Sequence, residues 1–198
     1  CRRASYLLVG SPPCDPYSQL LHISAGRRDP AELELQRQKG RHHLRTSIGF
    51  YQRQHDAGRL FLHEHPAGAD SWDDEHMVGL QMQDGVYTVS GPMCYWNKKV
   101  FCPKRGEGTV KKKAKFVTNS KKLAEALDQR CRNETGGPYH KHLVLIGNVA
   151  SGAASYSPEF VMCVLGALRE ELLERGTMSS VDMMTGGPVP TQALFDGS

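Results

Sequence analysis

Short apolar runs alternate along this chain with segments in which apolar residues recur every three or four positions. The runs predict strands at Ser5–Gly10, Arg59–His65, Gly85–Ser90 and His142–Ile146. The first run has no polar alternation, which is typical of a strand buried on both faces in a parallel sheet. Strands that alternate with helices indicate the α/β class, so we expect a mostly parallel sheet with flanking helices.

Helices are predicted between these strands. Asp29-Pro30 has the residues of a helix start, and the helix should end at Gly58. A second helix begins at Ser157-Pro158 and should end before Gly176. Shorter helices are expected at 73–81 and 121–131. We expect one domain over residues 1–176 and a disordered tail over 177–198, which has Gly and Pro but little apolar periodicity.

The composition narrows the class of protein. The chain has 198 residues, of which 39% are hydrophobic, enough for one core and too many for wholesale disorder. No apolar run reaches about 18 residues and no secretory signal is visible, so we expect no membrane association. Six cysteines without a Cys-x-x-Cys pair suggest reduced thiols, hence an intracellular protein, nuclear if eukaryotic. Cys1 stands where Met would open a reading frame, which suggests a fragment.

The modest net charge of +4 conceals a basic block. Residues 98–122 hold ten Lys or Arg and one acid, Glu107, a formal charge of +9, which leaves −5 for the rest. We read the block as a basic loop, because Gly106 and Gly108 interrupt it. Such a block is typical of a protein that binds a polyanion, although a solvated loop has the same composition.

Two residues have the surroundings of reactive groups. Cys14 follows the first predicted strand on a loop stiffened by Pro12 and Pro13, which presents a thiol in a fixed direction. Glu64 ends the apolar second strand, where a low dielectric favours the protonated carboxyl. The alternatives are a structural cysteine in a turn and an exposed glutamate at a strand end.

Two His-x-His pairs offer a metal-site alternative. His63 and His65 share one strand face, and His140 and His142 repeat the spacing. A metal-dependent hydrolase could use both pairs. However, His63 and His65 should point away from Glu64, and no carboxylate clearly completes a ligand set, so we predict no metal.

Several blocks together resemble the DNA cytosine-5 methyltransferases, most closely a divergent branch found in phages and algal retroelement polyproteins. The likeness covers roughly residues 5 to 170, and its most specific block is FLHEHPAGADSW. The blocks occur in the family's order: SPPCDPYS, FLHEHPAGADSW, GVYTVSGPMC, KKAKFVTNS and GAASYSP.

The resemblance implies a partial Rossmann-like class I methyltransferase sheet and a set of roles. Cys14 would attack C6 of a flipped cytosine and Glu64 would hold or protonate its N3. Pro12 and Asn148 would lie at the S-adenosylmethionine pocket. DNA would be the partner, with no obligatory protein partner visible. Its phosphates would contact the lysines of the basic block: Lys111, Lys112, Lys113 and Lys115. Trp96, Tyr95 and Phe116 could stack on a base, although Phe116 fits a core position better.

The sequence also departs from the family pattern. Asp15 replaces a Gln, His65 an Asn, Pro92-Met93 an Asp-Gln and Lys113-Ala114 a Pro-Thr. The glycine-rich turn that holds S-adenosylmethionine in the family would precede the Cys14 loop, where this chain has too few residues. We therefore expect that the chain alone does not bind the cofactor. The alternative function is a non-catalytic nucleic-acid-binding remnant of a mobile-element polyprotein.

Overall fold

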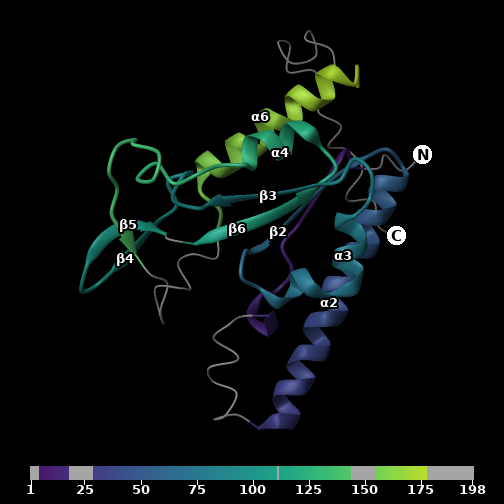
Figure 1. The fold of residues 1–198 in the computed structure, drawn as a ribbon, viewed down its shortest axis with the longest axis horizontal. Helices are drawn as coiled ribbons and strands as arrows, with labels where there is room; N and C mark the ends of the chain where they lie inside the picture. The colour runs from purple at the N-terminus through teal and green to yellow at the C-terminus, as the bar shows by residue number, and fades with distance from the viewer. Residues whose placement is uncertain (1–4, 18–28, 111, 144–154, 178–198) are drawn as a thin grey trace, which may run out of the picture.

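A four-stranded sheet lies at the centre of the fold, between two layers of helices (Figure 1). The structure is a computed structural model that describes residues 5–17, 29–110, 112–143 and 155–177. The strands occur in the order β1-β2-β6-β3. Their bounds are Leu7–Gly10 for β1, Leu60–Pro66 for β2, Tyr87–Pro92 for β3 and Lys113–Thr118 for β6.

The expectation of a mostly parallel sheet is wrong. β1 and β2 are parallel, but β6 is antiparallel to both of its neighbours, β2 and β3. The smaller sheet, β4-β5-β7, pairs β4 (Lys99–Cys102) antiparallel to β5 (Gly106–Val110) and β5 parallel to β7 (His142–Leu143). The fold is therefore mixed α/β with mostly antiparallel ladders, and in the larger sheet β1, β2 and β3 run in one direction against β6.

The cause of this error is the basic block. The loop expected over 98–122 contains β4, β5, β6 and the start of a helix. Lysine side chains can lie on the solvent side of a strand or extend along apolar surface, so a high charge does not exclude strands. Gly106, with φ of 72°, makes the tight turn from β4 to β5 instead of interrupting a loop.

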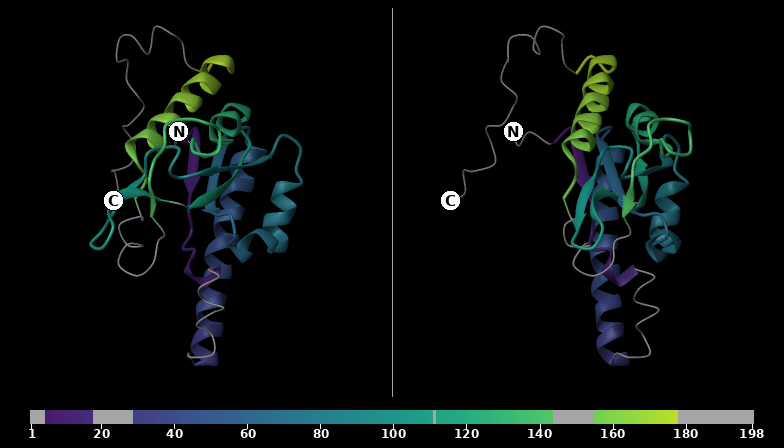
Figure 2. Two further views of the ribbon diagram at one scale, coloured as in Figure 1. Left: turned by 60° about the vertical axis from the view of Figure 1, so that its left-hand side comes forward. Right: turned by 90° about the vertical axis from the view of Figure 1, so that its left-hand side faces the viewer.

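The two helix layers follow the predicted boundaries closely. One face of the sheet is covered by α2 (Pro30–Asp56) and α3 (Glu75–Gln81), and the other by α4 (Lys121–Leu127) and α6 (Pro158–Glu174) (Figures 1 and 2). Short 3-10 helices occupy Asp15–Tyr17 (η1) and Asp70–Asp73 (η3). The first turns of α2 extend well beyond the sheet. Among the described residues, no helix combines the length and the apolar character that a membrane crossing needs.

Alternation along β2 assigns its side chains to the two faces. Phe61 belongs to the core under α2 and α3, whereas Leu62 belongs to the core under α4 and α6. By the same alternation, His63 and His65 lie on the α2 side and Glu64 on the α6 side. Phe116 lies opposite Glu64 on the neighbouring strand β6 and is fully buried, as its predicted core position requires.

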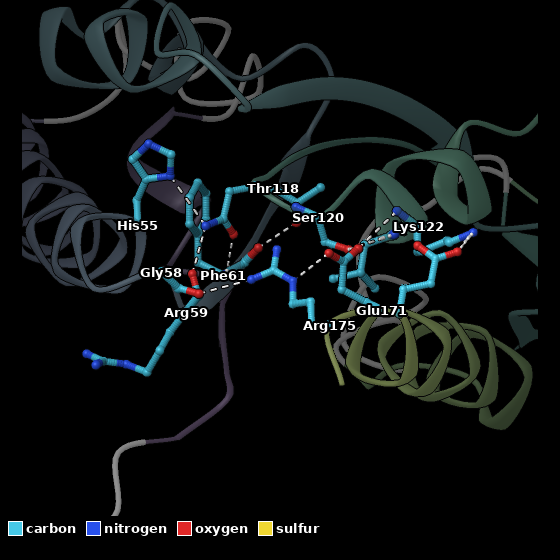
Figure 3. Close-up of polar contacts among 12 residues, drawn as sticks. His55, Gly58, Arg59, Phe61, Thr118, Ser120, Lys122, Glu171 and Arg175 are labelled. Carbon is cyan, nitrogen blue, oxygen red and sulfur yellow. Dashed lines mark hydrogen bonds and ion pairs between the residues drawn. The ribbon is translucent and has the colours of Figure 1, made fainter. Parts of the chain in front are cut away.

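A buried polar junction joins α6 to the sheet (Figure 3). Glu171 accepts hydrogen bonds from Ser120 Oγ at 2.7 Å and from Arg175 Nε at 2.7 Å. Ser120 caps α4, and Arg175 also donates to the carbonyl of Gly58, just before β2. The contacts therefore fix α6 relative to α4 and to the start of β2.

Candidate active site at the ends of β1 and β2

The loop after β1 carries Cys14 to the same edge of the sheet at which β2 ends. β1 and β2 are adjacent and parallel, with Gly10 opposite His63, so the residues that follow each pairing lie at one edge. His65 holds this loop on β2, because its Nε2 lies 3.0 Å from the carbonyl oxygen of Pro12. Cys14 itself is half-buried, and its carbonyl accepts a hydrogen bond from the Tyr17 amide at 3.0 Å.

Glu64 is a buried carboxylate whose two oxygens differ. Its side chain belongs to a residue only 4% exposed. Oε2 accepts hydrogen bonds from Ser11 Oγ at 2.8 Å and from Tyr156 OH at 2.9 Å. Oε1 is buried and accepts no hydrogen bond within the described part of the chain, while Lys112 Nζ lies 3.7 Å away from it. The arrangement leaves one carboxylate oxygen for a donor group of a ligand.

The sequence did not predict which groups surround Glu64. Ser11 and Tyr156 were not identified as site residues, and Lys112 was given another role. Ser11 is adjacent to the Pro-Pro-Cys motif, and Tyr156 lies in the late GAASYSP block, 92 residues from Glu64. Burial, followed by the Glu64 charge, raises the pKa of Tyr156, so its hydroxyl stays a donor. Lys112, which was expected at DNA phosphates, has its Nζ 3.7 Å from Glu64 Oε1, and its contact with DNA stays a prediction.

The burial of Cys14 and the charges around it together disfavour the thiolate form. Burial raises the pKa of the Cys14 thiol, Lys112 lowers it, and the carboxylates of Asp15 and Glu64 raise it. The result is a pKa above the ordinary thiol value. Cys14 therefore rests as the thiol, and of the neighbouring charges only Lys112 favours the thiolate, whereas Asp15 and Glu64 oppose it.

Alkylation of Cys14 should respond in opposite directions to two substitutions. Lys112→Met should raise the Cys14 pKa and slow its reaction with iodoacetamide at mildly alkaline pH, whereas Glu64→Gln should lower the pKa and speed the reaction. Rates are measured at each cysteine by peptide mass spectrometry. Cys163 on α6 provides the internal reference rate. Equal Cys14 rates in all three proteins would show that neither charge acts on the thiol.

The two histidines of β2 lie on the opposite face of the sheet from Glu64, as the strand alternation predicts. His63 Nδ1 lies 3.1 Å from Tyr51 OH, and His65 Nδ1 lies 2.5 Å from Ser71 Oγ. Burial, with a smaller contribution from His65, lowers the pKa of His63 to about 3, so it stays neutral. These contacts assign both rings to the interior, where they support β2 and the Cys14 loop.

The predicted phosphate-binding lysines lie in different surroundings. Lys113 is exposed on β6, and Lys115 Nζ lies 4.6 Å from the ring centroid of Trp72. Elsewhere in the basic block, Lys98 donates to Ser155 Oγ and Lys99 pairs with Glu107. Internal partners thus take up part of the charge. Lys111 lies outside the described residues, and the DNA contacts stay a prediction.

The aromatic residues that were considered for base stacking are engaged by the protein. Trp96 is buried at 3% exposure between Phe116 and Phe160. Arg132 stacks over the ring of Tyr95, with its guanidinium carbon 5.0 Å from the centroid. Trp96 is therefore a core residue, like Phe116.

The described residues at this edge do not fit S-adenosylmethionine. Gly10 is the glycine that follows the apolar run of β1, but a Cβ there would clash with the Tyr51 hydroxyl, so the space beside it is filled by protein. Pro12 is buried, and its carbonyl is engaged by His65. Asn148 lies outside the described residues. We therefore derive no methyl-transfer step from this structure.

Comparison with known proteins adds no relative from which a role could be transferred. The chain matches no family model, no curated protein and no solved structure.

Proposed function

We propose that the edge formed by β1 and β2 binds a cytosine base of DNA and adds the Cys14 thiolate to its C6. The observation that supports this proposal most directly is the Glu64 carboxylate, with Oε2 held by Ser11 and Tyr156 and Oε1 open beside Lys112. A fixed, buried carboxyl with one open oxygen suits the N3 edge of a flipped cytosine.

The proposed chemistry balances without a cofactor. The Cys14 thiol first releases its proton to solvent, and Glu64 takes a proton from solvent. The thiolate then forms an S–C6 bond, and the C5–C6 double-bond electrons shift so that N3 takes the proton from Glu64. The resulting enamine can accept a solvent proton at C5. Loss of the original C5 proton and expulsion of the thiolate then regenerate cytosine and return a proton to Glu64. Lys112 favours the thiolate at the start of this cycle.

The fold offers secondary support for this proposal. β1, β2 and β3 run in one direction between two helix layers, as they would in a partial Rossmann-like sheet with one reversed strand. In open sheets of this kind, ligands bind outside the carboxyl ends of the strands. Cys14 and Glu64 both lie at that edge.

Hydrogen exchange at cytosine C5 tests the proposal without S-adenosylmethionine. In heavy water, the protein should exchange the C5 hydrogen of cytosine in an oligodeoxynucleotide, which mass spectrometry of the nucleosides detects. Cys14→Ser should abolish exchange, because no S–C6 bond can form. Glu64→Gln should reduce it about 10²-fold or more, the usual contribution of a positioned acid or base. Cys163→Ser is the matched control and should exchange normally.

Two outcomes would reject the catalytic proposal. One is exchange that survives Cys14→Ser, and the other is no exchange with either single-stranded or duplex DNA. Binding of DNA without exchange would instead favour the non-catalytic nucleic-acid-binding function. That alternative is supported by the raised pKa of Cys14 and by the poor fit of Gly10 and Pro12 to the cofactor.

A further inference from the structure

Four potential metal ligands from distant parts of the chain converge beside the smaller sheet. Cys94 lies in the turn after β3, and Cys131 follows α4. His140 lies just before β7, and His142 is the first residue of β7. One side-chain donor atom from each residue falls within 4.8 Å of all the others. The cluster is separate from Cys14 and Glu64, and the sequence pattern alone revealed only its His-x-His half.

The donor atoms have the spacing of a tetrahedral site. With Zn–S of about 2.3 Å and Zn–N of about 2.05 Å, a tetrahedron has edges of about 3.8 Å between sulfurs, 3.6 Å between sulfur and nitrogen, and 3.3 Å between nitrogens. The Cys94 and Cys131 sulfurs are 3.7 Å apart. Cys131 Sγ lies 3.5 Å from Nε2 of His140 and of His142.

The remaining measured edge is the shortest. The Nε2 atoms of His140 and His142 lie 2.8 Å apart, so they must separate by about 0.5 Å to bind one zinc ion. Small rotations about the side-chain torsions provide this. The sulfur separation is far longer than the roughly 2.05 Å of a disulfide, and both cysteines are unpaired.

Hydrogen bonds around the cluster hold the ligand-bearing segments. The carbonyl of Cys131 accepts from the Glu134 amide at 2.9 Å and from the Thr135 amide at 3.2 Å, which closes a tight turn after the cysteine. Asn133 clamps the backbone of His140, since its side chain accepts from the His140 amide and donates to its carbonyl, both at 2.9 Å. These hydrogen bonds fix the backbone at Cys131 and His140 and so place their side chains for metal binding.

We propose that Cys94, Cys131, His140 and His142 bind one structural zinc ion. Two thiolates with two imidazoles in a tetrahedron favour zinc over the oxygen-seeking Mg²⁺ and Ca²⁺. Four protein ligands leave no open coordination position, which is the pattern of a structural site rather than a catalytic one. The site replaces the expectation of no metal, which considered carboxylates but not cysteines as the completing ligands.

The proposed ion would join segments that lie far apart in the sequence. It ties the turn after β3, in the main sheet, to β7, in the smaller sheet, and both to the segment after α4. It also lies close to the candidate active site, because the Met93 amide, next to Cys94, donates to the carbonyl of Lys112 at 2.8 Å. Loss of the ion should therefore loosen Lys112 as well as the smaller sheet.

Metal analysis of the full chain, purified under reducing conditions without chelator, tests the site. We expect one zinc per chain by elemental analysis. Replacement by Co²⁺ should give intense visible bands of tetrahedral cobalt, together with the near-ultraviolet band of thiolate ligation. Zinc should protect Cys94 and Cys131, but not Cys102 or Cys163, from alkylation by N-ethylmaleimide.

Matched variants locate the ligands. Cys131→Ser and His142→Ala should lose stoichiometric zinc, whereas Cys102→Ser and His55→Ala should retain it. His142→Cys should retain the metal with a stronger cobalt–thiolate band, which separates lost ligation from lost folding. Wild-type protein without zinc, a Cys94–Cys131 disulfide in the peptide map, or zinc retained in Cys131→Ser would each overturn the proposal.

Discussion

Substitution of Phe116 by alanine should destabilise the fold by about 3–5 kcal/mol. Phe116 is fully buried and packs edge-on against Trp96, at a centroid distance of 6.0 Å, and stacks with Phe160 at 5.8 Å. These partners come from the turn after β3 and from α6, so the cavity would separate three elements. The surrounding rings are rigid and cannot collapse far into the space. Urea unfolding followed by circular dichroism measures the change.

Phe101→Ala is the matched control. This phenylalanine lies on β4 and is 68% exposed, so its removal should change the free energy of unfolding by no more than about 0.5 kcal/mol. A similar loss for both variants, or a loss below about 1 kcal/mol for Phe116→Ala, would contradict the packing described for this core.

The apolar runs predicted β1 and β2, and the residues typical of helix starts and ends predicted most of the helices, because each is a local signal. β1, β2 and the long helix α2 begin or end within about two residues of their expected positions. In β6 only the end, Phe116–Thr118, is apolar, and its first residues have the composition of the charged loop that was expected there. The direction of β6 depends on pairing across the sheet, which no local pattern encodes.

The candidate sites show the same division between local and long-range information. Cys14 and Glu64 could be placed together from the sequence because Cys14 follows one apolar strand and Glu64 lies near the end of another, and adjacent parallel strands bring such residues to one edge. Tyr156 and Lys112 reach Glu64 through the packing of α6 and through the path of the chain from β5 to β6. The zinc ligands come from three segments, of which only His140 and His142 are close in the sequence.

The position of α6 links stability to the candidate active site. Tyr156, which holds Glu64 Oε2, lies two residues before the first residue of α6, and Ser157 caps the helix by accepting from the Phe160 amide. At the other end of α6, Glu171 and Arg175 contact α4 and the residue before Arg59 (Figure 3). A substitution at Glu171 that shifts α6 should therefore also shift Tyr156, which precedes the helix.

Glu171→Gln should cost about 2 kcal/mol at neutral pH, because Ser120 and Arg175 lose the charged acceptor of their hydrogen bonds. Burial raises the pKa of Glu171, but the hydrogen bonds from Ser120 and Arg175 outweigh it, so the net pKa is lowered. Since the pKa is lower in the folded state, this stabilisation is present above the unfolded-state value and disappears as the pH falls through the folded-state value. The wild type and Glu171→Gln should therefore converge in stability in acid, which urea titrations across pH measure. Glu174→Gln, whose side chain is 63% exposed, is the control and should cost less than about 0.5 kcal/mol. A constant difference between the wild type and Glu171→Gln at every pH would show that the charge of Glu171 does not stabilise the junction.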